Sequence, residues 1–175
     1  MKDDESHAAL DDAQGLGHEG RAGSGDHEVL KLWLRMLAST TQIESEIRRR
    51  LRERFGISLA RFDYMAQLYR FPGGLKMRVL SRYLMVTGGN ITGLTDELER
   101  EGLVMRSSSQ EDRRAWIVSL TPKGRRSFEA MAKEHEQWVL ELLSGLDAKA
   151  VQRLHAELGA LRVHLVRRLR PDPQS

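Results

Sequence analysis

The sequence predicts a mainly helical fold with one small β-hairpin, an α+β class, and three patterns carry this prediction. Apolar residues recur at helical spacing over most of residues 27–100 and 121–170. One stretch, residues 103–120, is instead rich in β-branched and aromatic residues around a polar centre. Gly, Pro or capping residues stand between these segments. The chain of 175 residues is 40% hydrophobic, which suits one domain with a core of its own.

Charge is distributed unevenly between the beginning of the chain and the rest. Residues 1–28 hold eight acidic and two basic residues, so the remainder carries a net charge of +9 within a total of +3. A basic body suits a polyanionic partner, although a solvated charged surface is the commoner explanation of such a balance. We expect residues 1–26 to be a disordered acidic tail and residues 171–175 to be a second, short tail.

Several classes of protein are disfavoured by what the sequence lacks. It has no apolar run long enough to cross a bilayer and no signal-like start, so a cytoplasmic location is expected. It has no Cys, which excludes disulfides and thiol redox sensing. The six His residues are scattered without a metal-ligand pattern, so neither a metal nor another cofactor is expected. No nucleophile and base are paired by any motif, so we do not expect an enzyme.

Four helices are predicted before the hairpin. Ser58 and Thr87 are N-cap residues, and Gly56 ends the long first helix. The predicted helices cover residues 27–55, 58–70, 76–85 and 87–101. In the first helix, Glu44–Arg48 and Glu46–Arg50 are i,i+4 pairs in the favourable order. A helix of this length seldom buries its whole surface inside one small domain, so we expect a partner subunit.

Two strands and two more helices complete the prediction. Residues 103–106 and 116–120 form the hairpin, with a polar loop between them. Thr121 and Pro122 open the next helix, and Asp147 caps the last one. A helix pair joined by a tight turn and followed by a hairpin is a winged helix-turn-helix, here over about residues 57–120. We expect a single domain over residues 27–170.

The residues expected to contact double-stranded DNA cluster at the start of the fourth helix and around the hairpin. Glycines let a backbone approach closely, Asn can pair with adenine, and a hairpin Arg can enter a narrow minor groove. The expected DNA-binding residues are Lys76, Ser81, Arg82, Thr87, Gly88, Gly89, Asn90, Thr92, Gly93, Arg106, Asp112, Arg113 and Arg114. A loop that happens to be Gly-rich, and an ordinary charged turn at the hairpin tip, remain open as alternatives.

Two motifs make the sequence similar to a known family. Residues 86–104, which read VTGGNITGLTDELEREGLV, resemble the recognition-helix region of MarR-family transcriptional regulators. Asp112-Arg113-Arg114-Ala115, followed by residues 118–124, resembles that family's wing signature. The resemblance covers residues 28–168 and implies a homodimeric repressor that binds a pseudo-palindromic operator. It implies that helical segments 27–55 and 121–170 serve dimerisation. It also implies that Arg114 enters the minor groove and that Asp112 positions it.

The same resemblance implies a small-molecule effector that releases the DNA, often an aromatic anion. Residues 59–68 are similar to members that regulate aromatic-acid catabolism, including members that respond to hydroxycinnamoyl-CoA thioesters, so an aromatic acid or aromatic acyl-CoA is expected. The expected pocket lies between the dimer helices and the winged domain. Its expected lining is Trp33, Met36, Arg61, Tyr64, Met65, Tyr69, His135 and Trp138. Core packing is the commoner role of such a Met and aromatic stripe, and an architectural DNA-binding protein without an effector is the alternative function.

Overall fold

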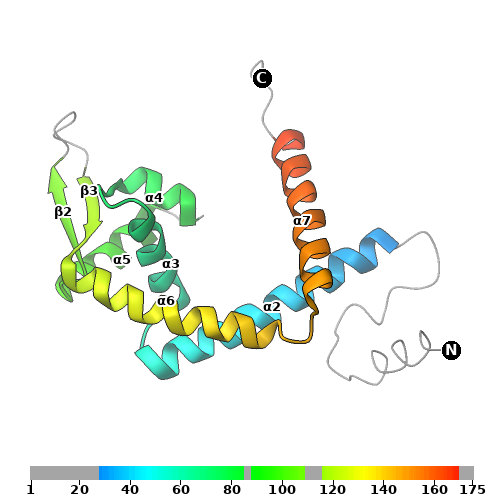
Figure 1. Cartoon of the computed structure of the whole chain (residues 1–175). Helices are drawn as coiled ribbons and strands as arrows, with labels where there is room; N and C mark the ends of the chain where they lie inside the picture. Colours follow the sequence, from blue (N-terminus) through cyan, green and yellow to red (C-terminus); the bar gives the residue numbers. More distant parts are fainter. Residues whose placement is uncertain (1–27, 85–87, 109–115, 170–175) are drawn as a thin grey trace, which may run out of the picture. The chain divides into compact units, whose positions relative to one another are not determined.

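The computed structural model describes residues 28–84, 88–108 and 116–169. Helices and a small antiparallel sheet make up this part of the chain, so the predicted fold class is confirmed (Figure 1). In chain order the elements are α2 (Glu28–Phe55), α3 (Leu59–Arg70), β1 (Leu75–Lys76), α4 (Met77–Leu84), α5 (Gly88–Arg100), β2 (Val104–Ser108), β3 (Trp116–Leu120), α6 (Pro122–Leu142) and α7 (Ala148–Arg168). None of the described helices combines the length and the apolar character that crossing a membrane requires.

The chain forms two compact units that divide within α6. The first unit ends at His135 and holds α2 to α5, the sheet and most of α6. The second unit begins at Glu136 and holds the end of α6 and all of α7. Residues 1–27 and 170–175, which include both predicted tails, lie outside the described residues.

Capping side chains hold three helix starts in the way that the sequence predicts. Ser58, Thr121 and Asp147 each accept a hydrogen bond from the backbone N–H three residues later, at 3.3, 3.0 and 2.7 Å respectively. Each cap satisfies one of the N–H groups that a helix start leaves without an intrahelical partner. Gly56 follows α2 with φ of 68°, a left-handed conformation that ends the helix. The predicted cap Thr87 lies outside the described residues.

The sheet has three strands, one more than the predicted hairpin. Its order is β1-β3-β2, and Val118 in the middle strand lies opposite both Leu75 and Arg106. The helix predicted to begin at Lys76 begins one residue later, because that residue is in β1. Two residues are too few to show a strand period, so the sequence did not reveal β1. Gly74 allows the pairing, since a Cβ there would lie 2.6 Å from the Val118 carbonyl oxygen.

The core of the first unit joins α3, α4 and α5 to the sheet. The side chains with less than 2% of their surface exposed are Leu51, Tyr64, Met65, Leu68, Leu80, Thr95, Leu98, Val104 and Val118. The Phe62 ring lies 5.4 Å from that of Phe128 and 4.8 Å from the His135 ring, which brings α6 into the same core. At the start of α6, a Cβ on Gly124 would lie 1.8 Å from the Leu103 carbonyl oxygen. Only glycine permits this helix to approach the sheet so closely.

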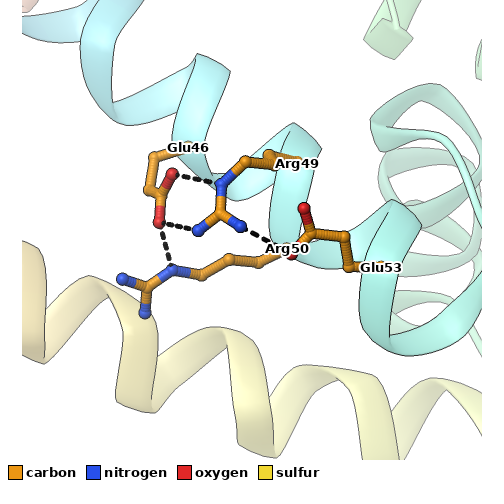
Figure 2. A network of polar contacts seen from close by, with 4 residues as sticks. All are labelled: Glu46, Arg49, Arg50 and Glu53. Atoms are coloured by element: carbon orange, nitrogen blue, oxygen red, sulfur yellow. Dashed lines mark hydrogen bonds and ion pairs between the residues drawn. The ribbon is translucent and has the colours of Figure 1, made fainter.

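Polar pairs cover the surface of α2 near its end. Figure 2 shows Arg49 between two carboxylates, with its Nη2 2.6 Å from Glu46 Oε1 and its Nη1 2.5 Å from Glu53 Oε2. Arg50 Nε donates to the same Glu46 oxygen at 2.6 Å, which confirms the predicted i,i+4 pair. The hydrogen bonds from Arg49 and Arg50 lower the pKa of Glu46 to about 2. These contacts all remain within one helix and therefore do not fix it to its neighbours.

Apolar side chains remain exposed on both α2 and α7. In α2 only Ile47 and Leu51 are buried, and in α7 no residue is buried. On α2 the exposed apolar residues are Val29, Leu30, Leu32, Trp33 and Leu37. From the end of α6 through α7 to the residue after it, they are Leu140, Leu143, Leu146, Val151, Leu154, Leu158, Leu161, Val163, Leu165, Val166 and Leu169. Apolar surface of this extent is unusual for a monomer and is typical of an interface.

Candidate nucleic-acid interface

Helix α5 has one buried and one exposed side. Ile91 and Leu98 are 2% and 0% exposed and face the core. Asn90, Thr92 and Gly93 are exposed on the first two turns. A Cβ added at Gly93 would meet no atom within 4 Å, so this surface is open. A small, polar and open surface of this kind suits the close approach of a DNA backbone and of base edges.

Further predicted contacts lie on β1 and on α4, and α4 packs against α5. Lys76 and Arg82 are exposed. Ser81 is half-buried, and its hydroxyl donates to the Arg78 carbonyl oxygen at 3.0 Å, within α4. Gly88 and Gly89 open α5. The remaining predicted contacts Thr87, Asp112, Arg113 and Arg114 lie outside the described residues.

Arg106 on β2 is directed at carboxylates of α5. Its guanidinium forms ion pairs with both Asp96 and Glu99, and its side chain is only 19% exposed. Its backbone N–H also donates to Glu99 Oε1 at 3.2 Å. Burial lowers the pKa of Arg106, but the hydrogen bond that Arg106 donates to Asp96 and the charges of Glu99 and Asp96 outweigh it, so the pKa is raised. The sequence did not reveal either acidic partner of Arg106, because Asp96 and Glu99 belong to α5 and Arg106 belongs to a separate element, β2.

A buried hydrogen-bond chain ties α5 to α3 on its other side. The Tyr64 hydroxyl lies 2.6 Å from Thr95 Oγ1, and the Thr95 hydroxyl donates to the Ile91 carbonyl oxygen at 2.6 Å. Tyr64 and Thr95 are both 0% exposed. Burial raises the pKa of Tyr64 to about 12, so the phenol stays protonated at neutral pH. Tyr64, expected from the sequence to line an effector pocket, is therefore part of the core beneath the recognition helix.

The other residues expected to bind an effector are spread over several environments. Arg61 pairs with Glu101, and its Nε has no hydrogen-bond partner among the described residues. The Tyr69 hydroxyl donates to Glu129 Oε1 at 3.1 Å. His135 stacks on Phe62, and burial lowers its pKa.

The remaining expected effector residues differ in exposure. Met65 and Trp138 are buried, at 1% and 9% exposed, Met36 is half-buried, and Trp33 is 53% exposed. Two of the expected residues border one aromatic cluster, since Tyr69 lies 4.9 Å from Phe128 and His135 lies 4.8 Å from Phe62. The expected effector pocket stays a prediction.

A pocket of about 270 Å³ lies instead among α2, α3, α4 and α5. It is lined by Glu44, Arg48, Arg52, Ser58, Leu59, Ala60, Asp63, Leu84 and Leu94. Within it Arg48 pairs with Glu44. Desolvation by burial and, to a smaller degree, the negative charge of Glu44 raise the pKa of Asp63. Sequence reasoning missed this pocket, because its ionisable residues come from positions of α2 and α3 that carry no motif.

The helix pair with its adjoining hairpin, and the open polar start of α5, define a winged helix-turn-helix DNA-binding protein. Residues 55–115 match the MarR family. The chain is also 31% identical to a MarR family transcriptional regulator from Silicibacter pomeroyi. That similarity covers 81% of this chain and 99% of the other, with a TM-score of 0.68. This protein therefore belongs to the MarR family of DNA-binding transcriptional regulators, and it is not an enzyme.

Curated relatives are similar over shorter segments. The uncharacterized HTH-type transcriptional regulator YdgJ of Bacillus subtilis is 29% identical over 107 residues, which are 61% of this chain and 65% of YdgJ. The transcriptional activatory protein BadR of Rhodopseudomonas palustris is 40% identical over 60 residues, which are 34% of each chain. Both similarities thus span less than two thirds of the relative's own length.

The raised pKa of Asp63 predicts how stability depends on pH. A carboxyl group with a raised pKa in the folded state holds its proton more tightly than in the unfolded chain, so stability falls as pH rises through that pKa. The Asp63→Asn variant removes this cost. We expect a larger free energy of unfolding than for the wild type at about pH 7.5. The gain should shrink as the pH falls below the ordinary Asp pKa of about 3.9, because residue 63 is then protonated in both the folded and the unfolded state. Urea unfolding at equal protein concentration measures it.

Glu136→Gln is the matched control, since it removes the same charge from an exposed position. It should change the unfolding free energy little at either pH. A wild type that is as stable as Asp63→Asn at about pH 7.5 would show that burial of this carboxylate carries no cost.

Proposed function

We propose that this regulator is a homodimeric, ligand-responsive repressor that binds a pseudo-palindromic operator. The observation that carries the proposal is the pairing of an open recognition helix with large apolar surfaces on helices outside the DNA-binding region. A single winged helix reads a short half-site. Two copies held in fixed relation read two half-sites about one helical turn of DNA apart, which gives both affinity and selectivity.

The dimer is proposed to form through α2 and α7. On α7 the exposed residues Val151, Leu154, Leu158, Leu161 and Leu165 recur at steps of three and four, which places them on one side of the helix. On α2 the side chains of Trp33 and Leu37 are exposed as well. Burial against a second copy would remove this surface from water, at about 25 cal/mol for each Å² of apolar area.

DNA is proposed to contact the exposed surface of α5 and the elements beside it. Asn90 and Thr92 would read base edges in the major groove, and the glycines of the first turns, Gly88, Gly89 and Gly93, would allow close approach. Lys76, Ser81, Arg82, Thr87 and Arg113 would bind phosphates. Arg114, positioned by Asp112, would enter the minor groove. Each proposed contact is assigned to a residue whose side chain suits it chemically.

The effector is proposed to be a small aromatic carboxylate in the pocket among α2, α3, α4 and α5. Its volume of about 270 Å³ suits a single aromatic ring with a short acidic side chain, and the CoA portion of a thioester would extend beyond it. Arg52 lines the pocket and has no ion-pair partner among the described residues, so it offers a cation to the ligand. Leu94 brings the recognition helix into the same lining, so that an occupant would act directly on α5.

Activation is the second candidate mode of regulation, because BadR is named a transcriptional activatory protein. An architectural role, in which the protein coats DNA with little sequence preference, is the third. Selection of bound fragments from the source genome followed by footprinting separates the three. A discrete palindrome that overlaps a promoter supports repression, a site upstream of the promoter supports activation, and uniform protection supports coating.

Two substitutions test the DNA contacts. Asn90→Ala should change the preferred base at one position of each half-site, at about 1–3 kcal/mol for each lost bidentate pair. Arg114→Ala should weaken operator binding while the dimer stays intact. Competition binding with a set of operators that differ at single positions measures both. Equal weakening on every sequence would make Asn90 a backbone contact, and unchanged affinity would remove Arg114 from the interface.

A double substitution tests the dimer. Leu154→Asp together with Leu158→Asp places two charges on the apolar side of α7. Sedimentation should then show monomers, and these monomers should bind the operator at least tenfold more weakly than the wild type. Gln152→Asp together with Ala156→Asp is the matched control. These exposed residues have the same spacing but lie on the opposite side of the helix. A dimer that survives the first pair of changes and not the second would place the interface elsewhere.

Calorimetry tests the effector. Titration with p-hydroxycinnamate and with its CoA thioester should give heat for at least one of them, together with release of the operator. Arg52→Ala should remove that response, whereas Arg70→Ala, which removes an exposed cation from the end of α3, should leave it intact. Neither heat nor DNA release with both compounds would eliminate this class of effector.

A further inference from the structure

We infer that Arg106 is a positioning residue, which fixes the wing strand β2 to the recognition helix α5 through Asp96 and Glu99 rather than binding a DNA phosphate. The inference rests on the proposed operator recognition, and it names the residues that fix the wing strand relative to the recognition helix. Three groups define this unit, which we call the wing clamp: the Arg106 guanidinium, the Asp96 carboxylate and the Glu99 carboxylate.

The contacts of Arg106 leave little of its guanidinium available to a DNA phosphate. Its two terminal nitrogens are used, Nη2 by Asp96 and Nη1 by Glu99, and its side chain is 19% exposed. One cation against two carboxylates leaves the clamp with a net negative charge, which repels a phosphate rather than attracting it. The planar fork of arginine suits this role, since it binds two carboxylates in a fixed relative orientation where lysine offers a single point charge.

The clamp lies at a position from which it can control the angle between helix and strand. Between α5 and β2 the chain has only three residues, and Gly102 there has φ of 69°. Glu99 also accepts the backbone N–H of Arg106 at 3.2 Å, so it holds both the main chain and the side chain of β2. Arg106 lies opposite Val118, which lies opposite Leu75, so the clamp acts on the row where all three strands meet.

Helix α5 is held on its inner side as well. Thr95 follows Ile91 and precedes Asp96 and Glu99 in the chain. Its hydroxyl is 2.6 Å from that of Tyr64 on α3. Thr95 directly precedes Asp96 in the chain, so the buried hydrogen bond and the clamp act on the same turn of α5. The helix is therefore fixed to α3 on its buried side, and the clamp fixes it to the wing strand β2. Recognition in two grooves at once depends on this fixed relation, since a small error in geometry is costly in binding.

The experiment measures operator affinity for the full-length dimer by fluorescence anisotropy at several salt concentrations. The decisive variant is Asp96→Asn with Glu99→Gln, which removes two negative charges near the DNA and releases Arg106. A phosphate-binding Arg106 predicts unchanged or tighter binding, because electrostatic attraction increases. The wing clamp predicts at least a tenfold loss, which is an effect of the opposite sign.

Arg106→Ala should cause a similar loss, and the triple variant should bind no worse than either, because all three residues act as one unit. The slope of log affinity against log salt should stay unchanged, whereas loss of a phosphate contact lowers it by about 1. Arg106→Lys should recover only part of the affinity, because the fork is lost. Arg49→Ala is the matched control. It removes an arginine that also bridges two carboxylates, but within α2 alone (Figure 2), and it should bind the operator normally.

Circular dichroism and sedimentation establish that each variant is folded and dimeric before its affinity is interpreted. A wild type and an Arg49→Ala control that both fail to bind a discrete site would contradict the proposed function. A normal wild type, with a carboxylate variant that binds as tightly or more tightly, would overturn the wing clamp alone. A lower salt slope for Arg106→Ala would likewise return Arg106 to the set of phosphate contacts.

Discussion

The orientation of α5 is the constraint on which the DNA-binding surface depends. A recognition helix is useful only if its exposed side is held at a fixed angle to the wing, because the two elements address different parts of one rigid duplex. Here the constraint has an apolar part, in which Ile91 and Leu98 are buried, and a polar part, in which Thr95 bonds to Tyr64. The polar part is directional, so it fixes rotation of the helix as apolar burial by itself does not.

Basic residues in this protein divide into two physical groups. Arg49, Arg50, Arg61 and Arg106 are engaged by carboxylates and serve to hold elements or turns of the chain. Arg82 on α4 is exposed, and α4 packs against α5. The net positive charge of the sequence therefore overstates the charge that is offered to DNA. Only the placement of each acidic partner decides which cations remain available.

The same chain leaves its long helices incompletely covered. Residue types that normally lie inside a protein are exposed along α2 and α7, while the DNA-binding region has a compact core. The two regions therefore differ in how far their apolar side chains are buried. The winged helix reaches a closed core with its own residues, and the outer helices present apolar surface whose burial needs a further partner.

Sequence by itself determined most of the architecture, because caps, turns and apolar spacing are local signals. Ser58, Thr121 and Asp147 specify helix starts through bonds that span three residues, and the apolar stripe of α5 specifies its buried side. The family resemblance likewise rested on contiguous motifs. Only the tertiary structure decided the partners of Arg106, the burial of Tyr64, the third strand at Leu75 and the pocket beside Asp63. Each of these joins side chains from separate elements, and the distance between such elements is set by packing, which no local pattern encodes.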